Sequence, residues 1–155
     1  MASNYARGRG LEYVAFFAPG KPETKGSTKA FVVAGRARIT NDNPRAKSWA
    51  AVVSHAAQLA MGGRGPTRSP VRLAVAFFMP RPASHYGTGK KAATLKPGAP
   101  EVCPKRPDLD KLARCALDAL TGIVYADDCQ VVEISTRKVY GERVGADVAV
   151  TWVEP

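Results

Sequence analysis

Apolar residues fall into short runs along the chain, separated by glycine, proline and charged residues. Short runs that are apolar throughout, or that alternate with polar residues, are typical of β-strands. The pattern predicts strands at residues 11–18, 30–35, 71–80, 129–140 and 146–153. The last two flank a turn across Gly141–Gly145, so they are predicted to form a hairpin.

Two further segments repeat their apolar residues at intervals of three and four, which is helical spacing. The first is predicted to begin with Asn43 as N-cap and Pro44 at the first helical position, and to end at Gly62. The second is predicted to begin with Asp108 as N-cap and to end at Gly122. The order ββαβαββ predicts an α+β fold, a two-layer sandwich in which two main helices cover one face of a mixed sheet. All 155 residues are predicted to form one domain.

The segment 81–107 differs from the rest, because it combines five prolines with several basic residues. A loop of this length inside a compact domain is usually functional. We predict a basic, flexible arm that contacts phosphates; the alternative is a solvated insertion. The predicted DNA-binding residues in and after this loop are Lys90, Lys91, Lys105, Arg106 and Lys111.

The net charge of the chain indicates which kind of molecule it binds. The chain has 23 Lys and Arg against 13 Asp and Glu, a net charge of +10. This surplus favours a polyanion, although DNA, RNA and an acidic membrane surface would all fit. No apolar run approaches the roughly 20 residues of a membrane span, and no signal peptide is expected. The three cysteines lack C-x-x-C spacing, which favours the cytoplasm over a disulfide framework or a zinc site.

Acidic residues gather where the second helix begins and after it ends. Asp108 and Asp110 lie where the chain passes from extended backbone into the helix, so their side chains can project to one side. Asp127 and Asp128 are adjacent, so only one of them should join that pair. Like charges this close repel, and Mg²⁺, which prefers oxygen ligands, would remove the repulsion. The alternative is structural, because aspartate also caps helices and turns.

The whole run PDLDKLARCALDALTGIVYADDCQVVE, residues 107–133, resembles the signature of the RusA family of Holliday junction resolvases. That signature has D-x-D-N-L at the head of a helix, then D-A-L, then Asp-Asp followed by Gln and an aliphatic residue. A G-x-P motif at Gly20–Pro22 is a looser similarity.

The resemblance implies a homodimer that cuts four-way DNA junctions by paired symmetric nicks with Mg²⁺, for which Mn²⁺ would substitute. It makes Asp108, Asp110 and Asp128 the metal ligands. Arg114 stands where the family usually has a catalytic lysine; it keeps the charge but is a poor proton donor. Lys111 replaces the usual Asn and could partly supply the missing lysine.

Two other functions are compatible with the sequence. One is a non-catalytic basic module that binds nucleic acid and whose aspartates only cap the helix. The other is a less selective Mg²⁺ nuclease that acts on branched replication intermediates. The charge surplus supports all three functions equally, whereas the ordered aspartates favour an enzyme.

Overall fold

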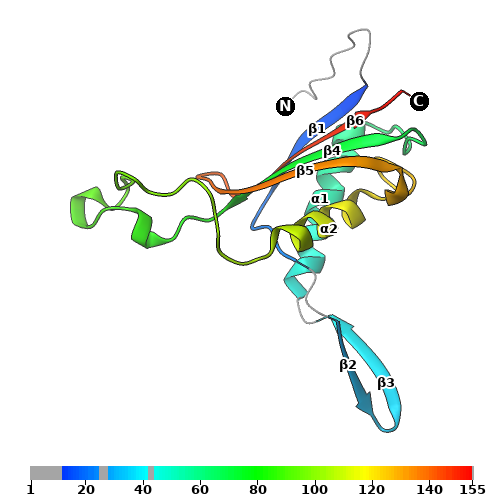
Figure 1. Ribbon diagram of the computed structural model, residues 1–155, viewed down its shortest axis with the longest axis horizontal. Helices are drawn as coiled ribbons and strands as arrows, with labels where there is room; N and C mark the ends of the chain where they lie inside the picture. Colours follow the sequence, from blue (N-terminus) through cyan, green and yellow to red (C-terminus); the bar gives the residue numbers. More distant parts are fainter. Residues whose placement is uncertain (1–11, 25–27, 42–43, 155) are drawn as a thin grey trace.

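The computed structural model of the chain describes residues 12–24, 28–41 and 44–154. Three strands come first, followed by an α-helix, a strand, a second α-helix and two further strands (Figure 1). The strands are β1 (Tyr13–Pro19), β2 (Thr28–Val33), β3 (Arg36–Asn41), β4 (Val71–Met79), β5 (Val131–Tyr140) and β6 (Gly145–Trp152). The α-helices are α1 (Pro44–Met61) and α2 (Leu109–Leu120), and the short 3₁₀ turns are η1 (Ala83–His85), η2 (Gly89–Lys91) and η3 (Asp128–Gln130).

The main sheet has four strands in the order β1-β6-β4-β5. β4 pairs antiparallel with β6 and parallel with β5, so the sheet is mixed. Both α-helices lie on one face (Figure 1), which confirms the predicted α+β architecture with two helices on one side. Side chains of β4 are buried at alternate positions, as expected when one face of a strand meets a helical layer. The core is formed from residues of all these elements, among them Trp49, Val53, Leu73, Phe77, Leu112, Leu120 and Val150.

The predicted C-terminal hairpin is wrong. β5 and β6 are consecutive in sequence, but β4 lies between them and pairs with both. β5 instead runs parallel to β4, and α2 provides the crossover connection that two parallel strands require. β4 is apolar apart from Arg72, and its interior place in the sheet pairs both of its edges.

The segment predicted as one strand at 30–35 is part of a β-hairpin, so three strands precede α1 rather than two. β2 and β3 pair antiparallel in a sheet of their own, which extends away from the main body (Figure 1). Ala34 (φ 51°) and Gly35 (φ 73°) form the connection. Two residues with positive φ suit the twist of a tight hairpin, and the sequence analysis missed this turn. The predicted N-cap Asn43 lies outside the described residues.

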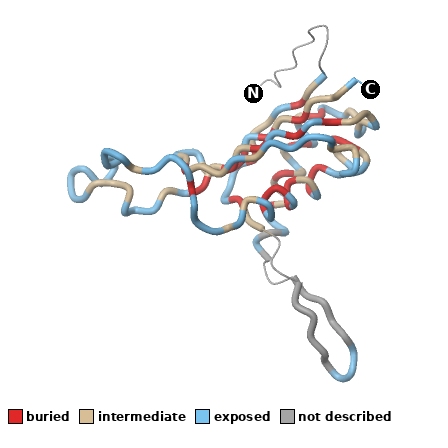
Figure 2. The backbone as a smooth tube through the Cα atoms, in the orientation of Figure 1, coloured by how far each residue is buried: buried red, intermediate tan, exposed pale blue. Residues whose placement is uncertain are grey.

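The predicted arm, residues 81–107, projects from the sheet where β4 ends, and most of it is exposed (Figure 2). Two side-chain hydrogen bonds link distant parts of the arm: Arg81 Nη1 donates to the Pro100 carbonyl at 2.8 Å, and Lys96 Nζ to the Ser84 carbonyl at 2.8 Å. At its base the Arg81 guanidinium lies 5.6 Å from the centre of the Tyr140 ring. The arm is therefore attached to the end of β5.

Candidate functional site

The head of α2 carries the first two aspartates of the motif. Asp108 is the N-cap residue in extended conformation, and its carbonyl accepts from the Leu112 amide at 3.1 Å. Its side chain makes no capping hydrogen bond and instead lies 3.0 Å from Lys111 Nζ. Asp110 is in the first turn of the helix and is exposed. Both carboxylates therefore face solvent, and neither is used to cap the helix.

Positive charge surrounds Asp108. A hydrogen bond from Lys111, together with its charge, lowers the pKa of the Asp108 carboxyl below its ordinary value, and the charges of Arg106 and Lys138 lower it further. Two of the predicted DNA-binding residues, Arg106 and Lys111, are thus neighbours of the acidic group. An ionised carboxylate among cations, open to solvent, is a suitable place for a metal and a phosphate to meet.

The other predicted basic residues lie just before α2, on α2 or on the arm. Lys105 is exposed just before α2, and Lys90 and Lys91 are exposed in η2 on the arm. Arg114 is exposed on α2, one turn after Asp110 and on the same side of the helix. The structure places these residues without testing their roles, which stay predictions.

The two aspartates after α2 are both exposed, and Asp127 is the one that caps the turn following the helix. Asp127 Oδ1 accepts from the Cys129 amide at 3.0 Å, and the Asp127 amide donates to Gln130 Oε1 at 2.9 Å, which together form a capping box on η3. The Gln130 side-chain nitrogen donates to the carbonyls of Thr67 at 3.0 Å and Ser69 at 2.9 Å. The hydrogen bonds from Cys129 also lower the pKa of Asp127. Asp127 therefore shapes the turn, while Asp128 is exposed.

The two halves of the acidic motif lie at opposite ends of α2. Asp128 precedes β5, which begins where α2 ends (Figure 1), and its charge acts on Tyr125 there. Burial raises the pKa of Tyr125 first of all, and the charges of Asp128 and Asp118 raise it further. The 12 residues of α2 span roughly 18 Å at the usual helical rise. The expectation that Asp128 joins Asp108 and Asp110 is therefore not met within one protomer.

The described residues of one protomer form no three-ligand metal site. Across residues 12–24, 28–41 and 44–154, no group of three Asp, Glu, His or Cys side chains lies close enough to hold an ion. The physical reason is topological: a helix separates the two motifs in sequence, and a straight helix keeps them apart in space. Two oxygen donors at the head of α2 still fit Mg²⁺, which commonly uses one or two carboxylates and keeps several waters.

Sequence analysis missed one residue at this site, Lys138. It lies near the end of β5, where its ammonium donates to the carbonyls of Lys105 and Pro107. Nothing in the local pattern marks it, because its partners are more than 30 residues earlier. The contact exists because the chain before α2 runs along β5: the Cys103 amide donates to the Lys138 carbonyl at 3.1 Å.

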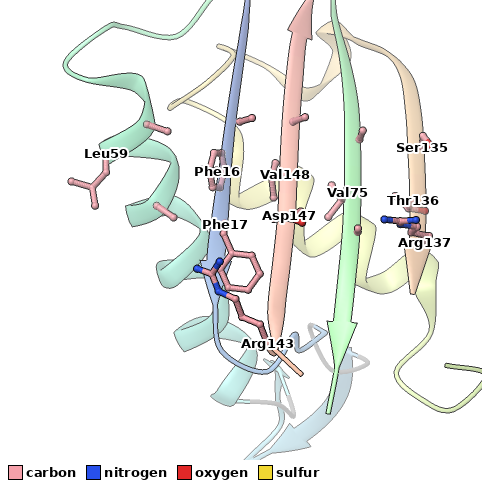
Figure 3. A pocket seen from close by; sticks show the side chains of 16 residues that line it. Phe16, Phe17, Leu59, Val75, Ser135, Thr136, Arg137, Arg143, Asp147 and Val148 are labelled. Carbon is pink, nitrogen blue, oxygen red and sulfur yellow. The ribbon is translucent and has the colours of Figure 1, made fainter. Parts of the chain in front are cut away.

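A hollow on the sheet lies apart from these residues. Figure 3 shows it on the sheet, with Phe17, Asp147 and Arg143 among its lining residues. The Arg143 guanidinium lies 3.5 Å from the centre of the Phe17 ring. Asp147 is the single carboxylate among the lining residues, and neither end of α2 contributes to it. We therefore place the candidate site at α2 and not at this hollow.

Comparison with known proteins agrees with the motif. The family model for endodeoxyribonuclease RusA matches residues 19–151, which is most of the chain. The chain belongs to the RusA family. RusA membership supports nuclease activity on DNA. A similar protein, the uncharacterized protein YqaN of Bacillus subtilis (strain 168), is 27% identical over 142 residues, covering 90% of this chain and 96% of YqaN. Within the described part of this RusA-family chain, neither α1 nor α2 has both the length and the apolar character of a membrane span.

Proposed function

We propose that the chain is a Mg²⁺-dependent, structure-selective endonuclease that resolves four-way DNA junctions by paired symmetric nicks. Family membership supports DNA cleavage, and one observation carries the assignment of the site. That observation is the pair of exposed carboxylates at the head of α2, with Lys111 3.0 Å from Asp108 and Arg106 nearby. Acidic ligands for a cation, surrounded by cations for phosphate, are what phosphodiester hydrolysis requires.

The roles of the residues follow from their positions. Asp108 and Asp110 would hold Mg²⁺ or Mn²⁺, which when bound supplies an acidified water and a Lewis acid for the phosphate. Arg114, one turn along the helix, would stabilise charge that develops on the phosphate, since a guanidinium holds its proton too tightly to donate it. Lys111 pairs with Asp108 in the free protein, and its flexible side chain can turn to a DNA phosphate.

The separation of Asp128 from Asp108 and Asp110 suggests what a homodimer would do: it would bring Asp128 of one copy to the two aspartates of the other. On its outer edge β5 exposes Val132 (62%) and Ile134 (45%). β4 pairs with the inner edge, and Val102 bridges to Val139 near the end of the outer one. The rest of that outer edge pairs with no strand in the part of the chain that the structure describes. An unpaired strand edge with apolar side chains is a template for pairing with another strand.

Antiparallel pairing of β5 with its copy would place the two α2 helices antiparallel on either side of a two-fold axis. The head of one helix would then lie beside the end of the other. In this arrangement Asp108 and Asp110 meet Asp128 of the partner subunit, and two identical sites face one junction. We therefore assign the third carboxylate to the second copy, which accounts for paired cuts.

Cleavage of a labelled four-way junction, beside a matched linear duplex and a flapped duplex, tests the proposed function in Mg²⁺ and in EDTA. We expect symmetric nicks at the junction in Mg²⁺ alone. Equal cutting of the flap would favour a less selective nuclease, and junction binding that is indifferent to Mg²⁺ without cutting would favour a binding module.

Mixing two inactive variants tests the shared site. Asp110→Asn and Asp128→Asn are each expected to be inactive. If each site draws on both copies, a mixed dimer regains one intact site and nicks one strand. If each site lies within one copy, the mixed dimer stays inactive and the shared site is wrong.

A further inference from the structure

Lys138 joins β5 to the chain before α2, and none of the roles assigned above involves this contact. Its side chain is half-buried near the end of β5 and donates to two backbone carbonyls, those of Lys105 and Pro107. Backbone pairing supports the same junction, since the Cys103 amide donates to the Lys138 carbonyl at 3.1 Å and the Tyr140 amide to the Glu101 carbonyl at 2.7 Å. The segment that leads into α2 is therefore fixed to β5, and Lys138 makes the contact closest to the helix.

The consequence concerns Asp108, the residue after Pro107. Aspartate at an N-cap usually folds back onto the free amides of the first helical turn, which fixes both the helix start and the carboxylate. Asp108 makes no such bond. The start of α2 must then be held by something other than the side chain of Asp108, and the two hydrogen bonds from Lys138 to the preceding carbonyls provide that support.

The chemistry of lysine suits this task. One ammonium carries three donors and no acceptor, so it can bind two carbonyls together, and a charged donor makes stronger hydrogen bonds than a neutral one. With the backbone before α2 held in this way, the Asp108 side chain is not needed to fix the helix start. Its oxygens accept from no helix amide, and one of them lies 3.0 Å from Lys111 Nζ, a partner that a cation could replace. Residues in this supporting position commonly alter metal affinity when they are replaced.

We propose that Lys138 is a positioning residue that holds the chain entering α2 and thereby keeps the Asp108 backbone extended, with a carboxylate that accepts from no helix amide and can bind the metal. The inference rests on the proposed function for its importance to catalysis, but the contact itself can be tested without activity. Lys138 does not touch DNA or the reacting atoms in this scheme; it acts through the Lys105 and Pro107 carbonyls.

The test compares Lys138→Met, which removes the donors, with Lys138→Arg, which keeps a cation with several donors. Arg64→Met is the matched control, because Arg64 Nε also donates to a backbone carbonyl, that of Met61 at 3.0 Å, far from the head of α2. Three quantities are measured on the full chain: amide exchange over residues 105–109, the Mn²⁺ dissociation constant by calorimetry without DNA, and the Mg²⁺ concentration for half-maximal junction cleavage.

We expect Lys138→Met to speed amide exchange over 105–109 and to raise the Mn²⁺ dissociation constant and the Mg²⁺ half-saturation concentration by about 10-fold or more. Lys138→Arg should restore both metal readouts to within about three-fold of wild type, and Arg64→Met should match wild type. Metal affinity unchanged in Lys138→Met despite faster exchange would overturn the proposal, because Lys138 would then be a purely structural tether. An arginine variant as defective as the methionine one would also overturn it.

These results separate the two hypotheses. A wild-type chain that cuts no junction contradicts the proposed function, whereas exchange and Mn²⁺ calorimetry still decide the role of Lys138. A wild-type chain that cuts normally, with Lys138→Met indistinguishable from it in all three measurements, contradicts the role of Lys138 alone.

Discussion

The two ends of α2 use the same residue type in opposite ways. At the start, Asp108 leaves the helix uncapped, pairs with Lys111 at 3.0 Å and remains exposed among cations. Beyond the other end, Asp127 closes a capping box with Gln130, which in turn bonds to the chain before β4. An aspartate whose oxygens accept from nearby amides shapes the backbone, whereas one whose backbone is fixed by other residues is free to bind a ligand. The hydrogen bonds around each aspartate, and not its motif, distinguish the two.

The largest expected effect on cutting comes from Asp110, the exposed carboxylate in the first turn of α2. Replacing Asp110 with Asn should lower single-turnover cutting of a four-way junction by more than about 100-fold, since loss of a metal ligand should exceed the loss of a supporting residue. Binding of the junction in Ca²⁺ or EDTA, measured by gel shift, should change little. Joint loss of binding and cutting would contradict a role in metal binding.

Replacing Arg114 should cause the next largest loss of cutting rate. Arg114→Ala is expected to lower the cutting rate by about 100-fold, because it removes a cation from beside the reacting phosphate. Arg114→Lys should retain most of the rate, and it introduces the residue usual in the family at this position. The comparison is made by single-turnover kinetics at saturating Mg²⁺. An alanine variant as active as wild type would show that the guanidinium lies away from the phosphate.

Replacing Asp127, beyond the C-terminal end of α2, should change the stability of the protein and not its cutting rate. Asp127→Ala removes the acceptor for the Cys129 amide and should lower the free energy of unfolding by about 0.5–2 kcal/mol, the usual value of an N-cap. Urea denaturation measures the loss, and junction cutting below the unfolding transition should be retained. Loss of cutting in a folded Asp127→Ala protein would place Asp127 in the site and remove the contrast between the two ends.

The smallest effect concerns pH. Lys111 lowers the pKa of Asp108 in the folded protein, so Asp108 stays ionised to a lower pH than an isolated carboxyl group. The stability from this pair is present above the unfolded pKa and is lost as the pH falls through the folded one. Lys111→Met should therefore raise the Asp108 pKa toward its ordinary value, as followed by NMR titration of the carboxyl carbon. Because both side chains are about half exposed, the change in stability should be slight.

Much of the fold could be read from local pattern. The spacing of Leu109, Leu112 and Leu120 predicted α2, and the structure confirms it at Leu109–Leu120. The long apolar run at 71–80 predicted β4. Strand pairing could not be predicted in the same way. Adjacency in sequence favours a β5–β6 hairpin, but in the folded sheet β4 lies between these two strands. The missed hairpin at Ala34 and Gly35 depended on two positive φ values that an Ala does not signal.

The candidate site, like the fold, could be predicted only in part from local sequence pattern. Residue identity and spacing were enough to find the carboxylates of the motif, the positive charge that accompanies them and the family that the motif resembles. The folded arrangement was needed to show that Asp128 lies a helix length from Asp108, that Asp127 caps a turn, and that Lys138 donates to carbonyls just before α2. Those relations depend on how distant segments pack, since a helix fixes separation in space and a strand brings together residues that no local pattern connects.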